Sequence, residues 1–378
     1  MNLTVTAGPH HYRNCPLQAP IGVGDLGYGE ASLVDADGNR IACQLFNDRG
    51  ADSVAWVEGD LRPRQTKTYR FETVPAGVGG SVEIEDIGRG KLEVRIGGEL
   101  VTRYHYGDEW ARPFLYPLNA PGGVRVTRGY PMESDIPGEK QDHPHQRSLW
   151  VAHGDINGTD NWSELEGHAF IRHRRFDEVT GGPVFGRIRS TNSWVSREGA
   201  KQMEDTREFT FYSIGSERLI DVRIRFLATN GDVRIGDTKE GGVLSIRVAS
   251  SMDGDRGGTI VNAYGGVTEA ETWGRPAHWV DYSGPVDGKT MGITVMDHPT
   301  SFRHPTRWHV RDYGLFAANP FALSYYEPEL GLKGDHTIPH GGKIDFAYRV
   351  LVHQGDAESA GVRDRYFGFI APPEVKVS

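Results

Sequence analysis

Two segments of the chain concentrate side chains that can move protons, bind metal ions or hold anions. Five of the 15 histidines lie between His143 and His173, and five more lie between His298 and His340. Imidazole exchanges protons near neutral pH, because its unperturbed pKa is about 6.5. Clustering of this kind predicts a functional site built from both segments.

The first segment, from Gln141 to Trp162, predicts one polar face. In an extended chain alternate side chains point to opposite sides. The odd positions then place six polar side chains together, namely His143, His145, Arg147, His153, Asp155 and Asn157. The even positions place Trp150, Ala152 and Ile156 on the other side, where we expect the core. A polar face is costly to bury unless it lines a wet or ligand-filled cleft.

Two kinds of chemistry fit this face. His143 and His145 can share a divalent metal ion, with Asp155 as a further ligand. Alternatively, one of the two histidines abstracts a proton while Arg147 holds a developing oxyanion. A third interpretation is a network of hydrogen-bonded histidines that only holds loops together.

The second segment runs from Met296 to Tyr326. The histidines at 298 and 304 each precede a proline, which favours an extended loop. Trp308 is suited to stacking on the apolar face of a sugar, and His309 points to the opposite side if this stretch is a strand. We expect substrate contacts from His298, His304, Trp308 and Tyr326, and acid-base chemistry from His309. An aromatic anchor flanked by solvated arginines is the alternative.

A charged turn lies between the two segments, at residues 236–242. It carries Lys239 and Glu240 and leads into a strongly apolar strand pattern from Val243. A carboxylate paired with an imidazole is what acid-base work on two faces of a substrate requires. We therefore expect His143, His145, Glu240 and His309 to be the catalytic set. The expected substrate-binding residues are Arg147, Trp150, His153, Asp155, Asn157, Lys239, His298, His304, Trp308 and Tyr326.

The elements that must position these residues are mostly strands. Segments of five to ten residues alternate apolar and polar side chains and stop at Gly, Asp or Asn, as half-buried strands do. The sequence predicts an all-β fold, a large antiparallel β-sandwich of stacked sheets. A boundary at Pro75–Gly80 divides a small N-terminal β-domain, residues 1–78, from a main domain, residues 79–378. A C-terminal helix is expected from Asp356 onward.

The composition excludes several partners. The 378 residues include 42 Lys and Arg against 51 Asp and Glu, a net charge of −9, so the basic surface that nucleic acid requires is lacking. No stretch approaches the roughly 18 apolar residues of a membrane-spanning helix, and no secretory signal is visible at the N-terminus. We expect a cytoplasmic protein without membrane or nucleic-acid partners, with a homo-oligomer left open.

Two further patterns concern cofactors and redox state. Gly22, Gly24 and Gly27 have the dinucleotide-binding spacing, but no strand precedes them and no helix follows, so we expect no nucleotide cofactor. Cys15 and Cys43 are expected to be small buried apolar groups.

The sequence resembles a bacterial family of all-β proteins labelled PmoA-like. The matching stretches are Pro113–Val124, Asp142–Trp150, Gly154–Gly158, Asp237–Gly241 and Asp297–Pro299 with Trp308 and His309. They span most of residues 79 to 370. The resemblance implies genomic association with sugar oxidoreductases and glycoside-processing enzymes, and hence a role in carbohydrate metabolism. The motifs are also similar to those of the stacked-sheet aldose epimerases, in which histidines and a glutamate surround a sugar.

Together these observations predict a carbohydrate-active enzyme whose partner is a small-molecule sugar. A lyase or hydrolase acting on an oxidised (keto) sugar or glycoside fits best, because a ketone acidifies the neighbouring C–H bond. Three alternatives remain open. They are a mutarotase similar to the aldose epimerases, a non-catalytic carbohydrate-binding protein that uses Trp150, Trp162, Trp273 and Trp308, and an oxygenase with iron on His143, His145 and Asp155.

Overall fold

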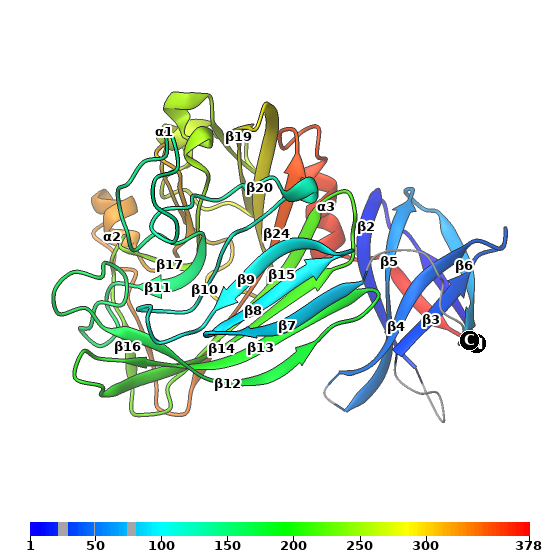
Figure 1. Cartoon of the computed structure of the whole chain (residues 1–378), viewed down its shortest axis with the longest axis horizontal. Helices are drawn as coiled ribbons and strands as arrows, with labels where there is room; N and C mark the ends of the chain where they lie inside the picture. The colour runs from blue at the N-terminus through cyan, green and yellow to red at the C-terminus, as the bar shows by residue number, and fades with distance from the viewer. Residues whose placement is uncertain (22–28, 49, 74–80) are drawn as a thin grey trace.

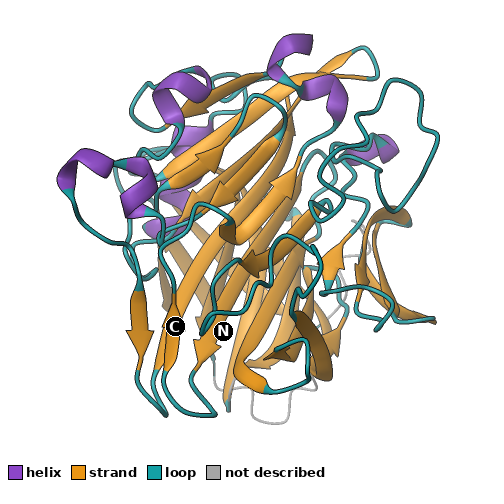
Figure 2. Ribbon diagram, turned by 90° about the vertical axis from the view of Figure 1, so that its left-hand side faces the viewer, coloured by secondary structure: helices purple, strands orange, loops and turns teal. Residues whose placement is uncertain are grey.

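The computed structural model describes residues 1–21, 29–48, 50–73 and 81–378, which form mostly antiparallel strands (Figure 1). These residues form three large sheets and a two-stranded ribbon. Figure 2 shows the strands stacked in layers, with short helices gathered toward one end. The prediction of an all-β chain with stacked antiparallel sheets is confirmed.

The first sheet contains the N-terminal strands and the last strand of the chain, in the order β2-β5-β4-β3-β6-β1-β25. Its strands are β1 (Asn2–Thr6), β2 (Tyr12–Pro20), β3 (Gly29–Val34), β4 (Arg40–Asp48), β5 (Ala51–Leu61), β6 (Thr66–Glu72) and β25 (Glu374–Val377). This sheet has its own apolar core, in which Cys15 and Cys43 are buried free thiols, as predicted.

The predicted N-terminal domain, residues 1–78, does not include all the strands of this sheet. Residues 374–377 fall within the predicted main domain, yet β25 pairs with β1 in the N-terminal sheet. Local sequence patterns do not reveal a pairing between opposite ends of a chain. The predicted boundary at 75–80 lies outside the described residues, as does the glycine motif at 22–27.

The main part of the chain is a sandwich of two eight-stranded sheets. The first, here the β11 sheet, has the order β21-β22-β17-β11-β10-β9-β8-β7. Its strands are β7 (Val82–Gly88), β8 (Lys91–Ile96), β9 (Glu99–His105), β10 (Phe114–Leu115), β11 (Leu149–His153), β17 (Gly241–Arg247), β21 (Trp308–Val310) and β22 (Leu315–Ala318).

The second, here the β24 sheet, has the order β12-β13-β14-β15-β24-β20-β19-β18. Its strands are β12 (Phe170–Thr180), β13 (Phe185–Val195), β14 (Lys201–Tyr212), β15 (Arg218–Leu227), β18 (Thr259–Asn262), β19 (Trp279–Val286), β20 (Lys289–Asp297) and β24 (Lys343–Gln354). A ribbon of β16 (Val233–Ile235) and β23 (His336–Ile338) completes the strands.

The largest apolar core lies between these two sheets. Leu149 and Ile246 from the β11 sheet and Val222 and Val350 from the β24 sheet are among its fully buried members. The side of the β11 sheet that faces away from this core is called its outer face below. Trp150, Ala152 and Ala317 belong to a separate, smaller apolar cluster on that outer face.

The alternation predicted for residues 141–162 is confirmed for Ile156, which lies in the main core, but it is reversed within β11. Within β11, Leu149 and Val151 point into the main core, whereas Trp150 and Ala152 point to the outer face. The strand spans only Leu149–His153. It is preceded by a turn and a positive φ at His143, and its register shifts after Trp150. Parity cannot be counted through a turn or a bulge.

Helices are short. They are α1 (Thr268–Thr272), α2 (Leu323–Tyr326), α3 (Val362–Ile370) and the 3-10 turns η1 (Pro121–Gly123), η2 (Ser250–Met252), η3 (Gly254–Arg256) and η4 (Pro328–Leu330). A C-terminal helix is confirmed, but it begins at Val362 because Gly361 adopts a left-handed conformation and Asp356 binds Ser359 within a preceding turn. Among the described residues, no helix is long and apolar enough to cross a membrane.

Gln44 of β4 joins the N-terminal sheet to the main domain. Its Oε1 accepts hydrogen bonds from the backbone N–H groups of Val184 and Phe185, both at 3.1 Å. All three residues are buried. A side chain at Gly182 would meet Gln44 at 2.3 Å, so the two domains approach closely here.

We expect Gln44→Leu to lower the free energy of unfolding by about 2 kcal/mol, because two buried N–H groups lose their acceptor. Urea unfolding of the full chain measures this. Gln18→Leu, at an exposed position of β2, is the matched control. Equal stability of the two variants would contradict the assigned role of Gln44.

Candidate functional site

A row of directly opposed residues crosses the outer face of the β11 sheet. His309 on β21 lies opposite Ala317 on β22, which lies opposite Ser245 on β17, which lies opposite Trp150 on β11. Three strand spacings separate His309 from Trp150, about 14 Å. The row therefore brings strands from the two histidine segments onto one face.

Glu240 is presented just before β17 begins, by a turn that is held on several sides. The backbone N–H of Gly154 donates to the Glu240 carbonyl at 2.7 Å, and the ring Nε2 of His153 donates to the Gly236 carbonyl at 2.8 Å. The Asn319 side chain donates to the Thr238 carbonyl at 3.0 Å. These contacts fix the backbone on both sides of Glu240.

Gly241 is required by the same packing. A side chain there would meet Nδ1 of His153 at 2.4 Å. His153 is buried and also packs edge-on against Phe321, with ring centroids 5.5 Å apart. It was predicted to bind substrate, but it instead positions the turn that carries Glu240.

The electrostatics of the site centre on Glu240. Burial alone would raise the pKa of Glu240, but the hydrogen bond from Lys239 and the neighbouring His309 and His145 outweigh it, so the pKa is lowered. The Glu240 side chain is 49% exposed and its Oε1 lies 2.9 Å from Nζ of Lys239. An ionised carboxylate is thus reachable from solvent at the point where the two histidine segments meet.

Both histidines beside Glu240 are held neutral. Burial, with Arg112 acting in the same direction, lowers the pKa of His145 to about 4. Burial also lowers the pKa of His309 to about 4, against the opposing effect of Glu240. Neither ring nitrogen of His309 makes a hydrogen bond of normal geometry, although the backbone of Lys239 lies close enough to oppose the lowering of its pKa. At neutral pH the two imidazoles are therefore proton acceptors.

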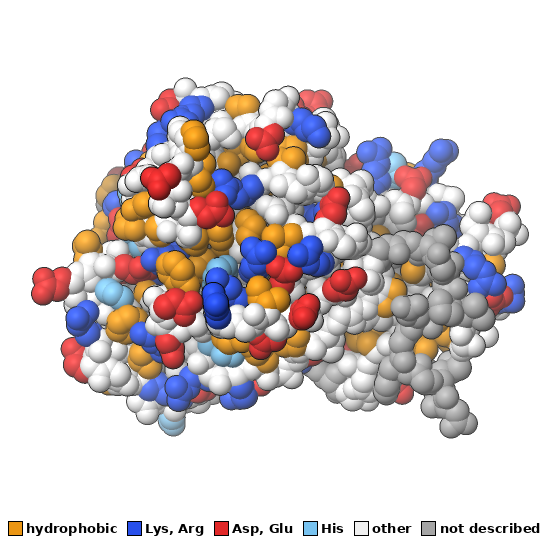
Figure 3. Space-filling model, viewed as in Figure 1, with side chains coloured by type: hydrophobic (Ala, Val, Ile, Leu, Met, Phe, Trp, Pro, Cys, Tyr) orange, Lys and Arg blue, Asp and Glu red, His pale blue; other side chains and the backbone are white. Residues whose placement is uncertain are grey.

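Aromatic side chains surround this group. The Trp162 ring lies 5.9 Å from His145 and 5.6 Å from Trp150. Tyr313 stacks on His143, with centroids 5.0 Å apart and planes 4° apart. Trp273 lies 6.5 Å from His309 and 5.0 Å from Tyr326. Figure 3 shows histidines on this side of the molecule among acidic, basic and apolar side chains.

Several indole donors near the histidines have no protein acceptor. They are the Nε1–H groups of Trp150, Trp162 and Trp273, all of them buried atoms. Buried polar groups usually find a partner in protein, water or ligand. Rings with unsatisfied donors beside a carboxylate and two imidazoles suit a ligand that offers both apolar faces and hydroxyl groups.

Arg147, which was predicted to hold an oxyanion, is bound to a carboxylate of the protein. Both of its terminal nitrogens bind Glu164, one of them at 2.7 Å from Oε2, and its side chain is 8% exposed. Arg112 binds the same carboxylate at 2.8 Å. Arg112 also donates to the backbone carbonyls of His145 and Trp162. The guanidinium groups stabilise the loop instead of holding an oxyanion.

The predicted sugar-stacking role of two tryptophans conflicts with their burial. Trp308 has no exposed surface and lies in the core between the sheets, where its indole N–H donates to the Ala277 carbonyl at 2.9 Å. Strand alternation puts Trp308 inside when His309 is outside. Trp150 is on the outer face but is equally buried, beneath Trp162.

His298 and His304 do not join Glu240. His298 binds Thr300 at 2.8 Å and lines a cavity between the outer side of the β24 sheet, β2 and α3. His304 binds Asp297 and His278. Both lie in the connection from β20 to β21, where their partners Thr300, Asp297 and His278 keep them on the β24 side of the sandwich.

The predicted metal set is not assembled. Asp155 pairs with Arg234 at 2.9 Å and accepts the N–H of Gly158. Asn157 ties the same loop to the backbone of Arg234 and Asp232. Within residues 1–21, 29–48, 50–73 and 81–378, no three His, Cys, Asp or Glu side chains are grouped to hold a metal ion.

Other predicted residues stay near Glu240. They are His143, His145, Lys239, His309 and Tyr326, the last two connected through Trp273. Sequence reasoning assigned no role to Glu164, Arg112 or Asn319. A buried arginine needs a carboxylate partner. That rule predicts a partner for Arg112 once its burial is known, but the sequence does not show that the partner is Glu164.

Comparisons with known proteins give a family and remote structural likenesses. A family model described as "Family of unknown function (DUF6807)" matches residues 91–366. No curated protein matches the chain. A protein in the glycosyl hydrolase family 38 from Enterococcus faecalis is 11% identical, with a TM-score of 0.43 over 100% of this chain and 47% of that one.

Two further solved structures are similar to this chain, with TM-scores equal to or lower than that value. An alpha-mannosidase from Enterococcus faecalis V583 is 10% identical, with a TM-score of 0.43 over 100% of this chain and 46% of that one. An alpha-galactosidase from Lactobacillus brevis is 7% identical, with a TM-score of 0.32 over 75% and 39%. The chain thus spans less than half the length of these structures. Because the family model covers well over half of the chain, the protein belongs to DUF6807, a family of unknown function.

Proposed function

We propose that the outer face of the β11 sheet is the active site of a carbohydrate-active enzyme. In this proposal His145, His309 and Glu240 handle protons on a bound sugar. The observation that carries it is the row of opposed residues across β21, β22, β17 and β11, which brings both histidine segments to the face where the turn carrying Glu240 enters β17. The charge of Glu240 acts on both His145 and His309. A carboxylate within electrostatic reach of two imidazoles from segments about 160 positions apart is an arrangement that acid-base chemistry uses.

The surroundings favour a sugar over other small molecules. A pyranose offers C–H faces for aromatic rings and hydroxyl groups that both donate and accept hydrogen bonds. Trp273 and Tyr313, which are half-buried, supply the rings, and the unsatisfied indole and imidazole nitrogens supply matching polar groups.

The protonation states favour proton abstraction by imidazole as the first step. On an oxidised sugar, neutral His145 takes the proton from the carbon next to the ketone. The electrons of that C–H bond form a C=C bond as the C–O bond to the leaving group breaks. The leaving oxygen then receives the proton from His145. Glu240 stabilises the imidazolium that exists between these events.

This sequence makes the enzyme a lyase on a keto glycoside, with an unsaturated keto sugar and a free alcohol as products. Subsequent addition of water across the new double bond would give overall hydrolysis. Arg147 has no part in the step, since Glu164 occupies it.

We expect His145→Gln and Glu240→Gln each to lower kcat on a p-nitrophenyl keto-glycoside by about 10²-fold or more, as loss of a general base or its charged partner does. Release of p-nitrophenolate measures the rate. The His145→Gln fold should survive, because Arg112 binds the backbone carbonyl and not the ring of His145.

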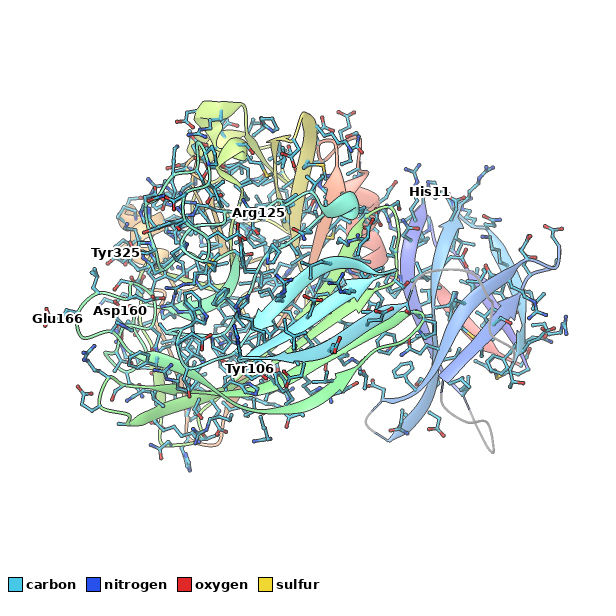
Figure 4. The ribbon with its side chains drawn as sticks, viewed as in Figure 1. His11, Tyr106, Arg125, Asp160, Glu166 and Tyr325 are labelled. Atoms are coloured by element: carbon cyan, nitrogen blue, oxygen red, sulfur yellow. The ribbon has the colours of Figure 1, made fainter. Side chains whose placement is uncertain are left out.

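His11→Gln is the matched control. His11 directly precedes β2 of the N-terminal sheet and pairs with Asp60, far from the end of the molecule marked by Asp160 and Tyr325 (Figure 4). Sugar binding by His145→Gln, followed by calorimetry, separates catalysis from recognition. Wild-type protein that binds sugars but turns over neither keto-glycosides nor reducing aldoses would be a binding protein and would refute the proposal.

The rate should also depend on pH in a distinctive way. Because burial lowers the pKa of His145 and of His309 to about 4, both stay unprotonated as the pH falls through 6. We expect kcat/KM to hold through neutrality and to fall as the pH drops through about 4, when the bases are protonated. A pH-rate profile, with circular dichroism to monitor folding, tests this. An acidic limb at the ordinary histidine value of 6.5 would contradict the assignment.

A further inference from the structure

A cavity of about 410 Å³ lies between the N-terminal sheet and the main domain. One wall is the outer side of the β24 sheet, which is the side that faces away from the main core. The opposite wall comes from β2, β5 and α3, and α3 packs against β2 (Figure 1). The volume is typical of a site for a small molecule, and such sites often lie between domains. None of the lining residues belongs to the site around Glu240.

Strand register lays charged side chains in two neighbouring rows on the β24 side of this cavity. The first row, across β13, β14, β15 and β24, consists of Arg187, Thr210, Asp221 and Arg349. The second row, on the same strands, consists of Arg189, Glu208, Arg223 and Ala347. Neighbours within a row are about 5 Å apart. The two rows therefore hold more arginines than carboxylates.

The carboxylates of both rows are bound at short range. Asp221 accepts hydrogen bonds from Nε and Nη2 of Arg349 at 2.6 and 2.8 Å, and from the hydroxyl of Tyr212 at 2.9 Å. Oε2 of Glu208 lies 2.9 Å from Nε and 2.8 Å from Nη2 of Arg189. The remaining arginines of these rows have no carboxylate as near.

Arg187 and Arg223 are these remaining arginines, and both line the cavity. The carboxylates described near Arg187 are those of Asp48, Glu178 and Glu208, at 3.6, 3.6 and 4.0 Å. These distances exceed a hydrogen bond, and the buried Nε of Arg187 has no hydrogen-bond partner among the described residues. Arg223 lies 4.0 Å from Glu208, and its side chain is 65% exposed. Guanidinium groups with unused N–H donors suit the oxygens of a carboxylate or phosphate.

His298 brings a further donor to the same cavity. Its Nδ1 accepts the backbone N–H of Thr300 at 3.2 Å, so a neutral ring carries its hydrogen on Nε2. Burial, with Arg223 acting in the same direction, lowers the pKa of His298 and keeps the ring neutral. Phe369 supplies apolar surface, with its ring centroid 4.9 Å from that of His298. The walls thus offer N–H donors beside an apolar ring, while the carboxylate in them, on Asp221, is already bound.

We propose that this cavity binds an organic anion of monosaccharide size through its carboxylate or phosphate group. Arg223 and the Nε2–H of His298 hold the oxygens of that group, and Arg187 adds positive charge to the same cavity. The body of the ligand lies against Phe369. A sugar acid and a sugar phosphate share the oxyanion, and the site separates both from a neutral sugar.

This binding site does not depend on the function proposed above. Neither Glu240 nor His145 lines the cavity. We therefore expect Glu240→Gln and His145→Gln to bind the anion with the affinity of the wild type.

Calorimetric titration of the full chain with glucuronate and with glucose 6-phosphate tests the proposal, at about 0.15 M NaCl so that diffuse attraction is screened. We expect at least one of these anions to bind, and Arg223→Gln to raise its Kd about tenfold or more, because a charge-assisted hydrogen bond is lost. The fold should survive, since the Arg223 side chain is largely exposed.

Arg225→Gln is the matched control. It removes the same charge two residues further along β15 and on the same face, but Arg225 binds Asp345 and does not line the cavity. Its Kd for the anion should stay close to that of the wild type. The anion that binds identifies the group, carboxylate or phosphate, and methyl glucoside serves as the neutral probe.

Four results would overturn the proposal. Neither anion binds with a Kd below about 10 mM; Arg223→Gln leaves the affinity unchanged; Arg225→Gln weakens binding as much as Arg223→Gln does; or Glu240→Gln abolishes binding. Binding of methyl glucoside that Arg223→Gln weakens would overturn an anion as the ligand class.

Discussion

The pairing of β17 with β11 on one side and β22 on the other is the constraint on which the candidate site depends. It places Trp150, Ser245 and Ala317 in one row and brings His309 onto the same face. Gly241 and Gly242 make this pairing possible, since side chains there would meet His153 at 2.4 Å and Ser245 at 2.0 Å. The ladder thereby fixes where Glu240 emerges, at the N-terminal end of β17.

Buried ion pairs hold the loop that carries His145. Arg112 and Arg147 share Glu164 on one side, and Arg128 and Arg247 share Asp142 on the other. Arg112 and Arg128 also bind backbone carbonyls of the loop, at His145, His143 and Gln146. Removing one partner of the Glu164 pairs, whose carboxylate is 15% exposed, costs about 3–5 kcal/mol. The pairs of Asp142 contribute less, because that side chain is 39% exposed and solvent screens it. Because these contacts use the backbone, the His145 ring remains available for chemistry.

The segment from Asp297 to His309 divides its histidines between two faces of the sandwich. It leaves the β24 sheet at the end of β20 and enters the β11 sheet at β21. His304 stays with Asp297 and His278, Trp308 fills the core, and His309 emerges on the outer face. One short stretch of sequence therefore supplies two separate groups of titratable side chains. Neighbours in sequence are separated here by the thickness of a packed layer.

The sequence by itself determined the all-β class and the C-terminal helix, and it singled out His145, Glu240 and His309 as candidate chemical groups. Strand alternation, turn residues and residue type are local properties, so they can be recognised in the sequence without a structure. Only the tertiary structure decided that Arg147 is bound to Glu164, that Trp308 is a core residue and that His304 belongs with His278. It also reversed the faces of β11, because a turn and a bulge interrupt the alternation. Which carboxylate neutralises a given cation depends on chain segments far apart in sequence, and that choice is made by sheet order and packing.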